Sequence, residues 1–146
     1  MKPIWMRAVV LSTLGMSLFL AACDTSMELS RKPTVEAVLN VPFSLAAGQT
    51  AVLAGEHLSV TFVRVLDDTR CPLDAVCVLA GDATMSVRAQ QEGIAAKALS
   101  LTLLGNLQGV AYEGFAFHAQ QLMPGQLSGQ TIPPEDYSVR LLVDRP

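Results

Sequence analysis

Apolar residues recur at every second position over most of this chain. The alternation with polar neighbours is cleanest in three segments, 83–89, 99–103 and 137–143. A period of two is typical of a β-strand with one buried face. The same pattern, or a short apolar run, marks five further segments: 43–45, 50–53, 58–66, 76–80 and 115–119.

Turn residues separate these segments, so we predict an all-β fold with seven or eight short strands. Such a chain forms a single β-sandwich, immunoglobulin-like, or a small barrel. The segment 95–104 contains Ala and Leu that would suit a short helix, but its alternation favours a strand. In segment 58–66 we expect Leu58, Val60, Phe62 and Leu66 to share one apolar face.

The N-terminal segment carries a different pattern. Lys2 and Arg7 precede thirteen uncharged, mostly apolar residues, 8–20. A membrane-spanning helix needs about 20 such residues, so this run is too short to span comfortably. A short positive region followed by an apolar one predicts a signal peptide over residues 1–22.

The end of that segment, Leu20-Ala21-Ala22-Cys23, resembles the lipobox of bacterial lipoproteins. The resemblance implies cleavage before Cys23, a diacylglyceryl group on its thiol and a place in the cell envelope, facing the periplasm from the inner or outer membrane. An ordinary secretory peptide is the alternative. Asp24 resembles an inner-membrane retention signal of some enteric bacteria.

We predict a tether over residues 23–40, in which structure could begin at 35–39, and a domain over 41–146.

Net charge and aromatic content exclude several classes of function. The net charge is −3, and removal of residues 1–22 leaves 8 basic and 13 acidic residues. This acidic balance argues against nucleic acid as a partner. The only Trp, Trp5, leaves with the signal peptide. The lack of Trp argues against a glycosidase, whose paired carboxylates usually work in a cleft with aromatic platforms.

Two cysteines remain beside Cys23. In an exported chain, a Cys71–Cys77 disulfide is the expected state. A metal site that uses both thiolates is the alternative, but five intervening residues do not match the spacing of zinc knuckles. The disulfide would fix the shape of segment 70–77.

Four carboxylates surround this segment: Asp67, Asp68, Asp74 and Asp82. Together they could bind Ca²⁺ through oxygen ligands. We favour a solvated loop in which aspartates make turn hydrogen bonds and Arg70 pairs nearby.

Other chemistry-bearing residues are sparse. His57 is expected in an exposed turn and His118 on a solvated strand face that includes Ala116 and Gln120. Met85 follows the inward alternation and is expected in the core; with Met123 and a histidine it could otherwise bind Cu(I). Because hydrolase, nucleotide-binding and zincin motifs are absent from the sequence, we predict no enzyme activity, catalytic residue, cofactor or metal.

The cysteine segment is similar to a motif of small, poorly characterised bacterial lipoproteins. This chain reads Asp68-Thr-Arg-Cys-Pro72 and then Cys77-Val-Leu-Ala-Gly-Asp-Ala83. That family usually reads Asp-Ser-Arg-Cys-Pro and then Cys-Ile/Val-Trp-Ala-Gly-Asn/Asp-Ala, so Thr69 and Leu79 depart from it. The similarity covers about residues 43–89, with a plausible strand at 137–143. It implies architecture and location, not an activity.

These observations predict a lipid-anchored, non-catalytic binding or scaffold module for an envelope protein. A loop held by a disulfide loses less entropy when it binds a partner. The predicted interaction residues are Asp67, Asp68, Arg70, Pro72, Asp74, Gly81 and Asp82. One alternative is an inhibitor of an exported hydrolase, a protease or lysozyme, that uses loop 67–81. Another is a metal-binding envelope protein that uses the four aspartates, or His118 with Met123.

Overall fold

The structure is a computed structural model that describes residues 32–105 and 108–146. The predicted signal peptide, Cys23 and the first part of the tether lie outside these residues. Within the described ranges the chain forms nine strands in two sheets and one short 3₁₀ helix, η1 (Pro134–Asp136). The predicted all-β fold is confirmed. None of the helical structure in this part of the chain is long or apolar enough to cross a membrane.

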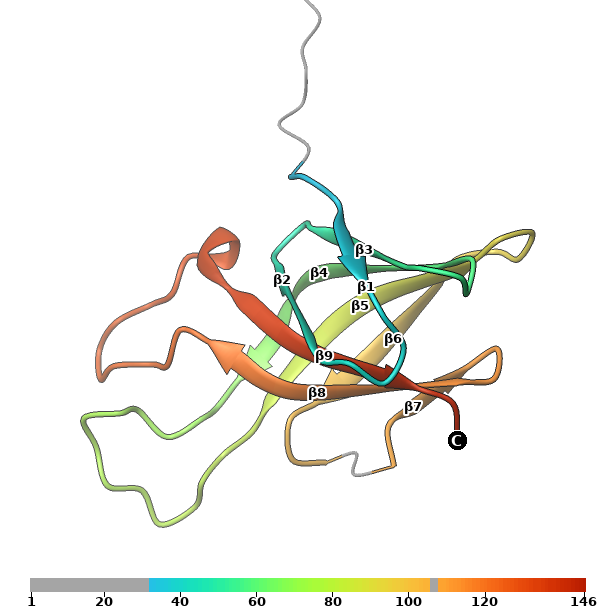
Figure 1. Cartoon of the computed structure of the whole chain (residues 1–146). Coiled ribbons are helices and arrows are strands. Elements are labelled where there is room, and N and C mark those ends of the chain that lie inside the picture. Colours follow the sequence, from blue (N-terminus) through green and yellow to red (C-terminus); the bar gives the residue numbers. More distant parts are fainter. Residues whose placement is uncertain (1–31, 106–107) are drawn as a thin grey trace, which may run out of the picture.

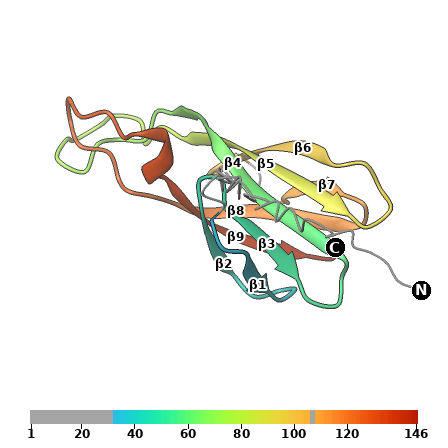
Figure 2. The same ribbon diagram turned by 90° about the horizontal axis from the view of Figure 1, so that it is seen from above.

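The two sheets pack face to face as a β-sandwich (Figure 1, Figure 2). The first has the order β1 (Val35–Ala37), β3 (Thr50–Leu53), β4 (Leu58–Asp68), β5 (Ala83–Gln91) and β6 (Lys97–Thr102). The second has the order β2 (Phe43–Ala46), β9 (Ser138–Asp144), β8 (Phe115–Met123) and β7 (Val110–Tyr112). Only β1 pairs in parallel, with β3; all other pairs are antiparallel.

The strand order is that of two meanders. Strands β3 to β6 follow one another within one sheet, and β7 to β9 do so in the other. In an immunoglobulin domain, successive strands cross between the sheets more often, so that strands A, B, E and D share one sheet and C, F and G the other. The sandwich is therefore as predicted, whereas its connections differ from the immunoglobulin order.

The core lies between the sheets and is built from the alternating positions. Its largest fully buried side chains include Phe62, Met85, Phe115, Phe117 and Leu141. Burial of such side chains removes apolar area from water and is the main stabilising contribution to the domain. The expectation that Met85 fills the core is confirmed.

Two local predictions are wrong. Segment 76–80 is not a strand: it belongs to the loop between β4 and β5, where Val76 and Val78 are fully exposed. Leu66 does not face the core but is 48% exposed. The register of β4 against β5 shifts twice, between Phe62 and Arg64 and between Val65 and Asp67. Each β-bulge adds one residue and so interrupts the alternation of faces.

Candidate functional site

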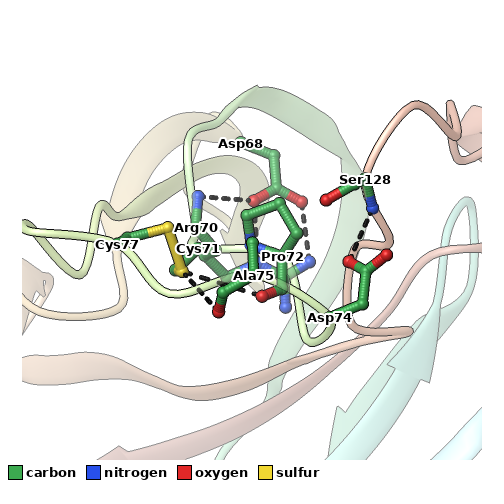
Figure 3. Close-up of a disulfide and its surroundings, with 8 residues drawn as sticks. All are labelled: Asp68, Arg70, Cys71, Pro72, Asp74, Ala75, Cys77 and Ser128. Atoms are coloured by element: carbon green, nitrogen blue, oxygen red, sulfur yellow. Dashed lines mark hydrogen bonds and ion pairs between the residues drawn. A yellow bond between two sulfur atoms is a disulfide. The ribbon is translucent and has the colours of Figure 1, made fainter.

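The loop of residues 69–82 joins β4 to β5 and extends from one end of the sandwich (Figure 1). Cys71 and Cys77 form the predicted disulfide across it, with their Cα atoms 5.9 Å apart (Figure 3). At its base the strand pairing continues briefly: Thr69 N donates to Asp82 O at 2.8 Å, and Cys71 N donates to Ala80 O at 3.0 Å. The disulfide and these hydrogen bonds give the loop a defined conformation.

An ion pair anchors the start of this loop. Arg70 donates from Nε to Asp68 Oδ1 at 2.7 Å and from Nη2 to Oδ2 at 2.6 Å. Tyr137 Oη donates to the same Oδ2 at 3.1 Å. The side chain of Asp68 is 6% exposed and that of Arg70 is 17% exposed. A bidentate, largely buried pair of this kind fixes geometry more firmly than a surface salt bridge does.

Arg70 also joins the loop to the segment that follows β8. Its Nη1 donates to Leu122 O at 2.6 Å, and its Nη2 donates to Pro124 O at 2.9 Å. Gln126 Nε2 donates to Asp68 O at 3.0 Å. One guanidinium thus links the ends of two strands in different sheets, so the predicted interaction residues Asp68 and Arg70 have a structural role.

A second contact between these segments lies farther along the loop. Leu73 N donates to Gln126 O at 2.8 Å, and Asp74 Oδ1 accepts from Ser128 N at 2.8 Å (Figure 3). The Ser128 amide and hydroxyl lower the pKa of Asp74. Segment 125–130 therefore supports the loop along one side.

The pKa of Asp68 results from opposing contributions. Burial alone would raise it, but the hydrogen bonds and charge of Arg70, with the hydroxyl of Tyr137, outweigh burial and hold the pKa below its usual 3.8. Burial and the neighbouring Asp68 carboxylate raise the pKa of Tyr137. The pair is therefore ionised, and the tyrosine neutral, at neutral pH.

Acid should destabilise the domain through Asp68. A carboxyl whose folded pKa lies below its unfolded value stabilises the fold above that unfolded value, and the contribution is lost as the pH falls below it. We expect the melting temperature to drop as the pH falls below about 4, and the Asp68→Asn variant to show a weaker drop. Thermal unfolding followed by circular dichroism from pH 6 to 2.5 measures both. The neighbouring, exposed Asp67→Asn change is the matched control; identical profiles for Asp68→Asn and the wild type would contradict the assignment.

The four aspartates do not converge. Asp68 binds Arg70, Asp74 binds the Ser128 amide, and Asp67 is exposed. Asp82 Oδ1 accepts from three backbone amides: those of Ala83 at 2.7 Å, Leu103 at 3.1 Å and Leu104 at 3.1 Å. Within residues 32–105 and 108–146, no three His, Cys, Asp or Glu side chains group as metal ligands would. The predicted Ca²⁺ alternative is therefore not supported by the arrangement of these carboxylates.

The histidines are also held separately. His57 is exposed in a turn, as predicted, and its Nδ1 lies 2.8 Å from Glu92. The expectation of a solvated face around His118 holds only for Gln120, which is exposed, because Ala116 is buried and the half-buried His118 Nε2 lies 3.2 Å from Asp144 Oδ2. Met123 lies five positions beyond His118 and lines a different surface, described next.

A groove of about 470 Å³ lies where the loop meets the ends of β6 and β8. Its lining is mostly apolar and includes five large side chains: Leu73, Leu103, Leu104, Leu122 and Met123. Arg70, Asp82, Gln120 and Gln121 are the polar lining residues. Because Arg70 and Asp82 already have partners, this groove offers apolar contact area with two amide side chains beside it.

Beyond the groove, the loop ends in an apolar tip formed by Val76, Val78 and Leu79. The two valines are fully exposed and Leu79 is 81% exposed. Side chains of this kind seldom gather on a protein surface without a binding role. The predicted interaction residues of the loop are all polar, Pro or Gly and do not include these three, although the unusually apolar run 76–80 was the available signal.

The comparisons with known proteins leave the geometry as the guide to function: no protein-family model, curated protein or solved structure matches the chain.

Proposed function

We propose that this protein is a lipid-anchored lipoprotein of the bacterial cell envelope that acts as a non-catalytic binding module for an envelope protein. The lipobox-like sequence before Cys23 supports the anchor and the location. The cysteine pair, which forms a disulfide here, fits an oxidising compartment.

The apolar groove between the loop, β6 and β8 carries the binding role. Its volume is large enough for apolar side chains of a partner, and the amide groups of Gln120 and Gln121 lie beside it as hydrogen-bonding groups, with Gln121 Nε2 3.5 Å from Met123 Sδ. The disulfide and the Arg70 contacts hold its wall in place before binding, which reduces the entropy lost on association. The described residues that line it include no Ser, Cys or His that would serve as a nucleophile or base.

A photo-crosslinking experiment tests this function in native membranes. With benzoylphenylalanine at the exposed position Gln121, the full-length lipoprotein should form an adduct with one envelope protein. Leu104→Glu places a charge in the groove at an exposed turn and should reduce that adduct at least tenfold, because burying an unpaired carboxylate is costly.

Two further variants are the controls. Ile94→Glu introduces the same charge at an exposed apolar position in the turn between β5 and β6, at the other end of β5, and should leave the adduct unchanged. Cys23→Ser should move the protein from the membrane to the soluble fraction. An adduct that survives Leu104→Glu would overturn the groove as the site, and inhibition of a protease or lysozyme by the protein would favour an inhibitor instead.

A further inference from the structure

We propose that the apolar tip, Val76, Val78 and Leu79, inserts into the interface of the bilayer that carries the lipid anchor. This inference rests on the anchored state proposed above and adds a second, direct membrane contact. It leaves the groove for the protein partner, because none of the three tip residues lines the groove.

The chemistry of the tip fits hydrocarbon better than a protein partner. Binding hot spots between proteins are enriched in Trp, Tyr and Arg. The tip has only aliphatic side chains, which make no directional contact and gain from any apolar surroundings. Asp74 is the only charged residue in segment 71–80, and its carboxylate is turned back onto the Ser128 amide (Figure 3).

Along the direction of β4, the described chain runs into β1 from the loop end. Strand β1 runs parallel to β3 and therefore antiparallel to β4, which leads into the loop. Residues 32–34 therefore lie on the loop side of Val35 along the direction of β4. Two hydrogen bonds hold this entry: Lys32 Nζ donates to Ala47 O at 2.7 Å, and Gln49 Nε2 donates to Pro33 O at 2.9 Å.

The length of the tether agrees with this orientation. Gln49 pairs through its backbone with Phe62, in the middle of β4, so Lys32 lies at about that level. From Phe62 to Asp68 the strand rises about 20 Å, and the paired base of the loop, as far as Cys71, adds roughly 10 Å more. The nine residues from Cys23 to Lys32 can span at most about 30 Å. An extended tether therefore brings the Cys23 lipid to the level of the loop.

Because the lipid anchor already holds the protein at the membrane, a tip of three apolar side chains is sufficient for insertion. Three aliphatic side chains would not hold a free protein on a membrane, but the lipid makes their insertion an intramolecular step at high effective concentration. The rigid loop loses little further freedom when it inserts. The tip would then set the orientation of the groove relative to the membrane.

A single tryptophan placed at the tip tests the inference. We would use the mature, lipid-modified protein, which has lost Trp5 with the signal peptide, so that Leu79→Trp supplies its only indole. In phosphatidylcholine vesicles with brominated acyl chains, its emission should shift to the blue and be quenched at least twofold relative to vesicles without bromine. Ile94→Trp, exposed at the opposite end of β5, is the matched control and should show neither effect.

Substitutions of the other tip residues complete the test. Val76→Ser with Val78→Ser removes exposed apolar area without touching the core or the disulfide, and should lower the quenching of the Leu79→Trp variant to the level of Ile94→Trp. Absence of quenching would overturn the inference. A blue shift seen only in native membranes would also overturn the inference, because it would indicate a protein partner. A blue shift seen without any lipid, in a dimer of the protein, would overturn it as well. Loss of membrane retention, measured separately, would instead count against the anchor of the proposed function.

Discussion

Replacing Arg70 with methionine should destabilise the domain by about 3 kcal/mol. The change leaves the carboxylate of Asp68 largely buried without its cation, and it removes the two guanidinium nitrogens that donate to the carbonyls of Leu122 and Pro124. Breaking one side of a buried pair costs more than the pair itself contributes, because the remaining charge stays desolvated. Urea unfolding of the full-length protein in detergent, followed by circular dichroism, measures the loss.

A double-mutant cycle separates the ion pair from the other contacts of Arg70. Asp68→Asn removes the buried carboxylate charge that Arg70→Met leaves without a partner. The double variant should therefore be more stable than the sum of the two single losses predicts. Arg70→Lys keeps the charge but loses the planar fork, and should recover only part of the stability. A loss below about 1 kcal/mol for Arg70→Met would mean that the pair behaves like an exposed one.

Gly81→Ala should produce the second large effect, at the base of the loop. Gly81 has a φ of +65°, and a Cβ atom there would lie 1.7 Å from the carbonyl oxygen of Thr69. Since that oxygen belongs to the backbone next to Arg70, the clash is relieved only if the two sides of the loop separate. We expect a loss of at least about 2 kcal/mol, from backbone strain and the disrupted pairing together.

Gly93→Ala is the matched control for this change. Gly93 also has a positive φ, of +78°, but no heavy atom beyond its chain neighbours lies within 4 Å of its Cβ position. Its substitution should cost only the left-handed conformation, about 1 kcal/mol. Comparison of the two melting temperatures isolates the steric contribution, and equal losses would show that the loop base adjusts to a side chain.

Much of the fold follows from the sequence because burial at every second position is a local property. Segments 83–89, 99–103 and 137–143 alternate without interruption, and each lies within or overlaps a strand of the sandwich, β5, β6 or β9. The preference for a strand over a helix in 95–104 is confirmed by β6. Strand β7 was not predicted, because three residues carry too little periodicity to stand out.

The candidate site was predictable only in its covalent part. The expected export of the chain, with Cys71 and Cys77 left beside Cys23, predicted their disulfide, which the structure confirms, and the loop was identified through it. The predicted pairing of Arg70 with a nearby aspartate is confirmed by Asp68. The contacts of Arg70 with Leu122 and Pro124, and of Asp68 with Tyr137, were not predictable, since these residues lie more than fifty positions away and contribute backbone or hydroxyl oxygens. Such contacts leave no periodic signal in the sequence.

The sequence by itself determined the all-β class and the inward positions of most strands, because both depend on neighbours in the chain. It also predicted the disulfide, because that bond depends on the compartment expected for the chain. The tertiary structure decided the rest. Bulges in β4 turned Leu66 outward, and the lack of a partner strand left Val76 and Val78 exposed in the loop. Which strand end meets which loop depends on long-range pairing, and that pairing alone placed the groove and the apolar tip at one end of the molecule.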